Sequence, residues 1–518
     1  MTDPETAPET PEAGGIPGAA EDVAWRRLDP RMLLIYPVRE VVRFLPALLA
    51  IFIAGTAAGR TDWWHGLGIA IPVALGLLRY FTTYYRITAA RVELRRGLVN
   101  RHLLSTPLDR VRTVDVTASL THRLLGLTTV RIGTGTASTD DEDHLDLDGL
   151  PVEHARRLRA ELLRLGDTGS EAAPTDRVVV RFDPAWVRFA PLTTTGLVLA
   201  GGALGVAAQT LNAVGGFDDL DAEGIVNGAT GWSIWLAVPI GLVLLAILVS
   251  ALAIAGYVVT NWGFTLTHTG PRRHGAWHLR RGLLTTRETT VDDERVSGVS
   301  IADPLALRAA RGARVSAIVT GLDRGRSASS LLAPPCPRPV VDRVAAEVLG
   351  TVAPVQTPLT GHGPRARGRR YTRATGPVLV ALAVVVGAVA AGVLDTWWLA
   401  TLLALPAALL LAHDRAAALG HALVDRHLVA RSGSLDRRRE ALAVRGVIGW
   451  NLRASWFQRR AGLTTLVATT AGGRQAVTVL DVPVDTAVTL AHDAMPELLG
   501  QFLVSPETSA PSPAAPGL

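Results

Sequence analysis

Residues 85–133 read YRITAARVELRRGLVNRHLLSTPLDRVRTVDVTASLTHRLLGLTTVRIG. Val92 and Leu94 alternate with polar neighbours, and Val130 and Ile132 do the same near the end of the stretch. Alternation with period two is typical of half-buried strands. Gly97 lies between two such runs, where a hairpin turn needs a residue that tolerates positive φ. The stretch therefore predicts a small β domain.

This stretch recurs twice further along the chain. Arg95-Arg96-Gly97-Leu98 returns as Arg280-Arg281-Gly282-Leu283, and a weaker form returns as Arg431-Ser432-Gly433. A second glycine follows 29, 30 and 29 residues later, at Gly126, Gly312 and Gly462. Pro151, Pro339 and Pro483 then precede segments of helical periodicity, as expected of proline in a first helical turn. We expect three repeats of strands, each closed by one C-terminal helix.

Apolar segments precede each repeat in pairs. They lie near 42–59 and 66–81, near 190–211 and 232–257, and near 376–394 and 397–413. A membrane-spanning helix needs about 20 mostly apolar residues, and about 17 suffice. Tryptophans lie at the predicted outer turn of each pair, where the membrane interface favours indole rings. The pattern predicts six spanning helices in three hairpins.

Arginine placement predicts the orientation of these hairpins. Several arginines precede the first hairpin, whereas its loop carries only Arg60, and the loop at 212–231 carries none. Basic residues near the ends of spanning helices stay on the cytoplasmic side. We therefore expect a multi-pass protein of the cell (plasma) membrane, with both termini and all three repeats in the cytoplasm. No secretory signal pattern precedes the first segment.

These features predict the following organisation: disordered tails at 1–24 and 504–518, membrane hairpins at 25–81, 190–258 and 376–414, β domains at 82–166, 259–350 and 415–503, and flexible linkers at 167–189 and 351–375. Below, the β domains are called the first, second and third repeat.

Composition restricts the chemistry of the chain. The net charge is +6, and every basic residue is arginine. Aromatic residues are scarce outside the apolar segments, which argues against a nucleic-acid partner. Cys336 is the only cysteine, so an intrachain disulfide and a cysteine-rich metal site are both excluded. The motifs of nucleophilic hydrolases, phosphate-binding loops and zinc proteases are absent. We expect no enzyme activity, no cofactor and no metal.

Two acidic clusters and three histidines allow other interpretations. Residues 140–144 (DDEDH) and 219–223 (DLDAE) are acidic, but the calcium-loop spacing of the second cluster fails because Thr230 stands where a bidentate glutamate is required. We interpret them as a solvated hairpin tip and an acidic outer loop. His268, His274 and His278 are interpreted as surface residues of an insertion.

The paired apolar segments, followed by a β domain with RRG-L, DRV and GLTTV elements, resemble the bacterial membrane-flanked PH-like (pleckstrin homology) domain family, in its YdbS/YdbT-like form with three copies. The resemblance is clearest in the first and second repeats. It implies two packed antiparallel sheets capped by a C-terminal helix in each domain, and it implies no catalytic site.

One charged set is a candidate binding site. Arg95, Arg96, Arg280 and Arg281, together with Arg272 and Arg273, lie close to predicted membrane helices. A basic residue held near an anionic leaflet gains about 1 kcal/mol. The set is interpreted either as a lipid head-group site or as a determinant of topology that only rests on the lipid surface.

Two functions of different classes follow. The first is a membrane protein that presents three PH-like domains at the cytoplasmic face for scaffolding, partner binding, or envelope-stress or lipid sensing. The second is a transporter or export accessory subunit formed by the six spans, although these spans are almost uniformly Ala, Leu, Val and Gly. The partners expected are the bilayer with its anionic head groups and a membrane protein or a smaller PH-like paralogue, and self-association remains open.

Overall fold

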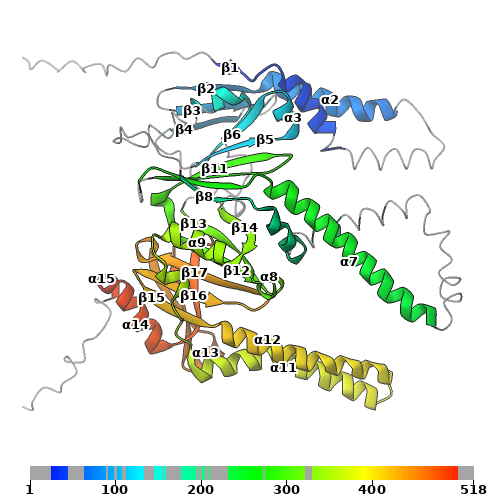
Figure 1. The fold of residues 1–518 in the computed structure, drawn as a ribbon, viewed down its shortest axis with the longest axis vertical. Coiled ribbons are helices and arrows are strands. Elements are labelled where there is room, and N and C mark those ends of the chain that lie inside the picture. The colour runs from blue at the N-terminus through cyan, green and yellow to red at the C-terminus, as the bar shows by residue number, and fades with distance from the viewer. Residues whose placement is uncertain are drawn as a thin grey trace, which may run out of the picture. The chain divides into compact units, whose positions relative to one another are not determined.

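A computed structural model describes most of the folded part of the chain (Figure 1). The described residues are 25–41, 43–44, 64–88, 91–97, 102–107, 113–133, 145–155, 157–158, 177–193, 198, 201–202, 205, 209, 232–271, 275–320 and 330–499. They divide into two compact units. Unit 1 takes residues up to Arg110 and Leu147–Leu150, and unit 2 takes Val111–Asp146 and the chain from Pro151 onward.

Unit 1 contains a four-stranded antiparallel sheet in the order β1-β2-β3-β4. Its strands are β1 (Arg26–Arg27), β2 (Tyr84–Ile87), β3 (Arg91–Arg96) and β4 (His102–Pro107). Helix α2 (Trp64–Thr82) leads directly into β2. On β3, Val92 and Leu94 are fully buried, as their alternation predicts, and the buried Glu93 is neutralised by Arg86 at 2.5 Å.

The first sheet of unit 2 joins strands of two repeats. Strands β5 (Thr113–Ala118) and β6 (Leu127–Gly133) belong to the first repeat, whereas β9 (Thr265–Thr269), β10 (Ala276–Arg281) and β11 (Thr286–Asp292) belong to the second. Strand β5 pairs with β11, and β8 (Arg177–Arg181) pairs with β9. The short helix α3 (Leu120–Leu124) connects β5 to β6, and β7 (Leu145–Pro151) follows in the chain. A sheet continuous between two repeats was not predicted.

A second sheet of unit 2 joins the second and third repeats in the same manner. Its order is β14-β13-β12-β17-β16-β15, and the strands are β12 (Val296–Pro304), β13 (Gly312–Val319), β14 (Leu331–Pro337), β15 (Gly420–Val424), β16 (His427–Ser432) and β17 (Asp436–Ala443). The third repeat ends in a separate sheet of β18 (Gly449–Arg453), β19 (Leu463–Thr469) and β20 (Ala476–Pro483). Figure 1 shows β12 and β17 side by side.

Short helices connect these strands. Helices η4 (Asp293–Arg295), α8 (Leu305–Ala309), η7 (Val444–Gly446) and α13 (Trp456–Arg460) lie within the second and third repeats, and α10 (Ala353–Gln356) and α15 (Pro496–Leu499) follow their last long helices. Two of the three predicted closing helices are α9 (Arg338–Leu349) and α14 (Val484–Ala494), and in the first repeat the described residues 152–155 after Pro151 are helical. Val341 and Val344 of α9 are fully buried, as their periodicity predicts. Pro337 is the N-cap residue of α9, so this helix begins at Arg338, one residue before Pro339.

Positive φ angles correct the predicted alignment of the repeats. Gly97, Gly282 and Gly433 occupy the hairpin turn with φ of 106°, 111° and 103°. The second left-handed residue is Gly126 at 69°, Arg311 at 57° and Gly462 at 66°. Arg311, not Gly312, is therefore the counterpart of Gly126, and all three spacings are 29 residues. Gly312 is small for another reason, since a Cβ there would lie 2.5 Å from the ring of Phe189.

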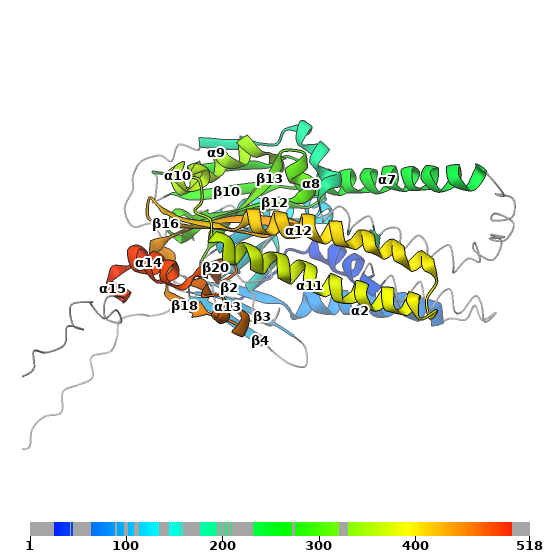
Figure 2. The same cartoon turned by 90° about the horizontal axis from the view of Figure 1, so that it is seen from below.

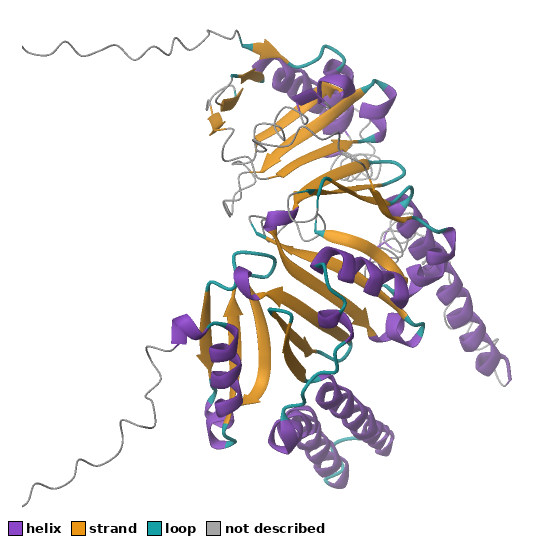
Figure 3. Cartoon of the chain, turned by 60° about the vertical axis from the view of Figure 1, so that its left-hand side comes forward, coloured by secondary structure: helices purple, strands orange, loops and turns teal. Residues whose placement is uncertain are grey.

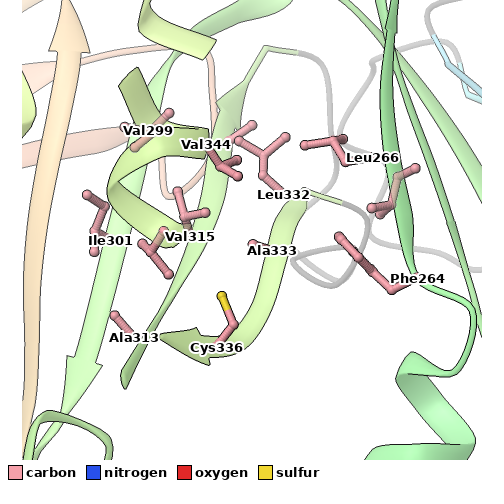
Figure 4. Packing of buried hydrophobic residues seen from close by; sticks show 14 of the residues in the cluster. Phe264, Leu266, Val299, Ile301, Ala313, Val315, Leu332, Ala333, Cys336 and Val344 are labelled. Carbon is pink, nitrogen blue, oxygen red and sulfur yellow. The ribbon is translucent and has the colours of Figure 1, made fainter. Parts of the chain in front are cut away.

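The main hydrophobic core does not stop at the predicted domain boundaries. Phe264, Val299, Val315 and Val344 of the second repeat form one cluster (Figure 4), which also contains Val429 and Ala441 of the third repeat. Conversely, Ile318 of the second repeat packs into the core of the third. Since apolar burial dominates folding, these two repeats are expected to fold together.

Three helices are long and apolar enough to cross a membrane: Val243–Asn261 within α7 (Trp232–Asn261), α11 (Gly363–Ala390), and Trp398–Ala418, which comprises most of η6 (Thr396–Leu403) and α12 (Ala404–Ala418). Helices α7 and α11–α12 project in the same direction from unit 2 (Figure 2). Most of the predicted segments 42–59 and 190–211 lies outside the described residues, and α2 contains only a shorter apolar stretch. Residues 363–375, assigned above to a linker, form the first half of α11.

Candidate membrane-docking site

The hairpin turn that recurs in all three repeats packs, in the second repeat, on the end of a membrane-capable helix. The backbone N–H of Gly282 donates to Trp262 O and that of Leu283 donates to Val259 O, both over 2.9 Å. These bonds satisfy carbonyls that the C-terminus of α7 leaves unpaired. Trp262, Leu283 and Leu284 are exposed around this contact, although indole and leucine side chains favour an apolar or interfacial environment.

The third repeat makes the corresponding contact with different atoms. Arg431 donates from Nε to Ala418 O over 2.9 Å and from a terminal nitrogen to Ala417 O over 3.1 Å, at the C-terminus of α12. Ser434, next to the turn glycine, donates to Asp414 of the same helix over 2.8 Å. A cation at a helix C-terminus is favourable because of the helix dipole. The turn therefore holds a membrane-capable helix in both repeats.

The four predicted head-group arginines do not act as equivalent pairs. Arg95 and Arg280 are exposed, whereas Arg96 is half-buried and Arg281 is 8% exposed. This follows from strand geometry, because consecutive side chains point to opposite faces. Burial, together with Arg287, lowers the pKa of Arg281 to about 10. Arg272 and Arg273 lie outside the described residues.

The two outer arginines also differ in their partners. Arg280 lies 3.4 Å from Glu288, which reduces its net attraction for an anion. Arg95 has no carboxylate partner among the residues that the structure describes. Arg95 belongs to unit 1 and Arg280 to unit 2, so each is considered as a separate contact with lipid.

A buried carboxylate that sequence reasoning missed connects α11 to the third repeat. Asp481 is 3% exposed and accepts from Arg369 Nε at 3.1 Å, from Arg370 at 2.6 Å and from Gln458 Nε2 at 2.7 Å. Leu480 and Asp481 together oppose a single residue of β19, so Asp481 lies in a β-bulge, and its φ is 53°. Bulges redirect side chains, and this one directs Asp481 to the membrane-capable helix. On sequence alone, Arg369 and Arg370 belong to an arginine-rich run before the fifth apolar segment and indicate only membrane orientation.

The corresponding positions on the last strand of the other two repeats also contact segments next to predicted spans. In the second repeat Pro334 and Pro335 form the bulge, and Pro335 O accepts from Tyr257 Oη of α7 over 2.7 Å. In unit 1, Gly149 has a φ of 75° and packs against Met32, and Asp148 accepts from Arg39 over 3.3 Å. Residues 32–41 are helical and precede the first predicted span. The bulge contacts a membrane-capable helix in the second and third repeats, and the corresponding residues of unit 1 contact the helical segment 32–41.

The sequence Arg27-Leu28-Asp29-Pro30 before the first hairpin recurs as Arg181-Phe182-Asp183-Pro184 before the second, and its role is local. Asp29 Oδ1 accepts from the N–H of Arg31, and Asp183 Oδ1 from that of Ala185, both over 2.9 Å. The latter caps η3 (Pro184–Leu192). Asp before Pro is a strong start signal for a helix, since the carboxylate satisfies an unpaired N–H and the proline needs none.

The histidine interpretation is wrong for His268. This residue is 5% exposed, its Nε2 lies 2.9 Å from Asp293, and its ring packs on Trp277. His278 is half-buried and bonds Thr290 over 3.0 Å, and His274 lies outside the described residues. Among the described residues no group of three metal-ligating side chains occurs. Both acidic clusters lie outside them.

A shallow pocket of about 480 Å³ lies where the second and third repeats meet. Its lining includes Glu294, Thr320, Arg445 and Ile448. Arg445 already reaches Val296 O over 3.5 Å. The pocket brings one carboxylate, Glu294, near one guanidinium, Arg445, with the hydroxyl groups of Ser297 and Thr320 in its lining.

A buried histidine pair beside the start of α11 predicts acid sensitivity. His362 and His421 are 5% and 6% exposed, with ring centroids 5.1 Å apart. Burial, and then the nearby His362, lowers the pKa of His421 to about 4. Burial also lowers the pKa of His362. Arg370 lowers that pKa further, whereas Asp481 raises it. In the unfolded chain both histidines take up a proton near pH 6.5, whereas in the folded chain they do so only at lower pH. The neutral pair therefore contributes its full share of the stability above about pH 6.5, and this contribution is lost as the pH falls towards 4.

We expect the unfolding temperature of the wild-type chain to be lower at pH 5 than at pH 7. The same change of pH should lower the unfolding temperature of His421→Phe by less. Differential scanning fluorimetry in one detergent at both pH values measures this. An equal fall in the unfolding temperature of the two proteins would show that the histidine pair does not cause the acid sensitivity.

Two stretches of the chain, residues 36–166 and 377–494, match the family model described as the bacterial PH domain. They cover the first and third repeats with their preceding apolar segments. The second repeat lies outside both matches, contrary to the expectation that the first two repeats resemble the family best. No curated protein and no solved structure matches the chain. The chain therefore contains PH-like sequence at both ends of its folded part.

Proposed function

We propose that this chain, two stretches of which match the bacterial PH domain, is a non-enzymatic, multi-pass protein of the cell membrane. In this proposal three membrane hairpins hold three PH-like domains at the cytoplasmic face, where they scaffold partners or respond to anionic lipid. One observation carries it: the Gly282 turn caps the C-terminus of α7, with Trp262 and Arg280 exposed beside it. An exposed indole and an exposed guanidinium beside the end of a membrane-capable helix support contact with lipid at this turn.

A topology experiment tests the membrane arrangement. In right-side-out and inverted vesicles, a membrane-impermeant maleimide is expected to label Gly66→Cys from outside and Asp141→Cys from inside. Cys336 is fully buried, and burial raises the pKa of its thiol to about 12, so it should stay unlabelled in the folded protein. The Cys-free control is Cys336→Ser. Labelling of the two positions from the opposite sides would contradict the orientation.

A second prediction tests lipid contact. Removing one exposed arginine is expected to weaken binding of phosphatidylglycerol to the full-length chain, by about fivefold where the full contribution of about 1 kcal/mol is lost. Arg95→Ala should have the larger effect, because Glu288 already neutralises part of Arg280. Native mass spectrometry of the detergent-solubilised protein, titrated with phosphatidylglycerol or with zwitterionic phosphatidylethanolamine, gives the measurement.

Arg343→Ala is the matched control, because Arg343 is also exposed but lies on α9. Equal phosphatidylglycerol affinity in all variants would leave the arginines as topology determinants only. Substrate-dependent flux through reconstituted vesicles would instead favour the transporter function.

A further inference from the structure

The two sheets shared between repeats are built on one register. At the first junction, Glu288 of β11 pairs with Val116 of β5. At the second, Arg439 of β17 pairs with Ile301 of β12. Glu288 and Arg439 each lie six residues after their turn glycine, Gly282 or Gly433, and Val116 and Ile301 each lie ten residues before their left-handed residue, Gly126 or Arg311.

The neighbouring pairs agree with this register. Arg287 opposes Thr117 and Thr289 opposes Asp115 at the first junction, and Arg438 opposes Ala302 and Glu440 opposes Ser300 at the second. Because a one-residue slip would turn every side chain to the other face, the agreement indicates one repeated mode of association between repeats.

An arginine contact recurs at both junctions as well. Arg123 of α3 donates to Leu283 O over 2.6 Å, and Arg308 of α8 donates to Ser434 O over 3.4 Å. Each arginine lies three residues before its left-handed residue, and each acceptor follows the turn glycine of the next repeat. Arg459 of α13 holds the same position in the third repeat, and it is exposed.

Two strands occupy the junction positions without a partner strand among the described residues. Strand β4 corresponds to β11 and β17 but pairs only with β3, and β18 corresponds to β5 and β12 but pairs only with β19. Leu103 on β4 is 60% exposed and Leu452 on β18 is 43% exposed. Leu103 lies six residues after Gly97, as Glu288 does after its own turn glycine. Leu452 lies ten residues before Gly462, as Val116 does before its own left-handed residue.

We propose that β18 of one chain adds to β4 of a second copy of the chain, in the register of the two internal junctions. Leu452 then lies opposite Leu103, Asn451 opposite Leu104, and Trp450 opposite Ser105. An unpaired edge strand is a template for backbone pairing with another chain, and here each chain offers the two complementary edges. The association is head-to-tail, so it generates a ring or a row rather than a closed pair.

Membrane attachment is compatible with such a row. Helices α7 and α11–α12 belong to successive repeats and project in the same direction (Figures 1 and 2).

Complementation between two blocked variants tests the proposal with the full-length chain in detergent. The Leu452→Lys variant has a charge on the contact edge of β18 and an intact β4. The Leu103→Lys variant has a charge on the contact edge of β4 and an intact β18. Light scattering after size-exclusion chromatography is expected to find oligomers of the wild type that grow with concentration, and monomers of each variant alone. An equimolar mixture is expected to form a one-to-one dimer that grows no further, since only one intact β18 can meet one intact β4.

Disulfide crosslinking fixes the register independently. A chain with Leu103→Cys and a chain with Leu452→Cys are mixed and oxidised, and a covalent heterodimer is expected, because opposed Cβ atoms lie about 5 Å apart. Ser105→Cys with Leu452→Cys is the control, two residues out of register on the same strand face, and should crosslink much less.

Both lysine variants should melt at the temperature of the wild type, because Leu103 and Leu452 are exposed. Several results would overturn the proposal: a monomeric wild type, oligomers of either lysine variant alone, a mixture that stays monomeric, or equal crosslinking in the control pair. Association of Leu103→Lys alone would point to a symmetric β18–β18 contact instead.

Discussion

Replacing Asp481 by alanine is expected to lower the free energy of unfolding by about 3 kcal/mol, because removing one partner of a buried ion pair leaves the other charge uncompensated. Arg369 and Arg370 would then share a buried site without a carboxylate. In a cooperative unit of 150–250 residues this corresponds to a fall in Tm of roughly 6–12 °C. Tryptophan fluorescence during heating in detergent measures it.

The matched variant is Asp481→Asn. Asparagine tolerates the left-handed backbone that φ of 53° requires, and its oxygen still accepts from Gln458, so this variant separates the charge from the bulge geometry. We expect an intermediate Tm. If the Tm of Asp481→Ala equals that of the wild type, the carboxylate does not attach α11 to the third repeat.

Gly433→Ala should destabilise the chain by a similar amount, about 3 kcal/mol, because strained backbone costs about 1–3 kcal/mol and a steric clash adds to it. The φ at Gly433 is 103°, and an added Cβ would lie 2.2 Å from Asp436 O. Movement of this turn also displaces Ser434 from Asp414 and Arg431 from the end of α12. Limited proteolysis near residue 419 should therefore accelerate together with the fall in Tm.

Gly361→Ala is the control for Gly433→Ala. Its φ lies outside the left-handed range, and no atom lies within 4 Å of its added Cβ, so its Tm should stay near that of the wild type. A Gly433→Ala chain with wild-type Tm and proteolysis rate would contradict the role of the turn.

Local features of the fold were predictable from residues close together in sequence. The alternation at Val92 and Leu94 located a buried strand face, Gly97 located a positive-φ turn, and the valines of α9 located a closing helix. The candidate arginines were found by their position near apolar segments. Their unequal exposure also follows from the period of a strand, once the register of β10 is known.

Other features depend on partners far apart in the chain. Asp481 is separated from Arg369 by 112 residues, and no spacing rule connects them. The alignment of Arg311 with Gly126 was missed because a glycine stands next to it, and only the φ angles distinguish the two positions.

The sequence alone determined the unit of this protein: a repeated β domain with a glycine turn and a closing helix, preceded by apolar segments. These properties come from side-chain periodicity and backbone preference, which act over a few residues. The tertiary structure alone decided how the repeats associate, because every strand edge offers the same backbone groups and only long-range packing selects its partner. That selection makes β5 and β12 continue into the next repeat and leaves β4 and β18 as the edges from which assembly is proposed.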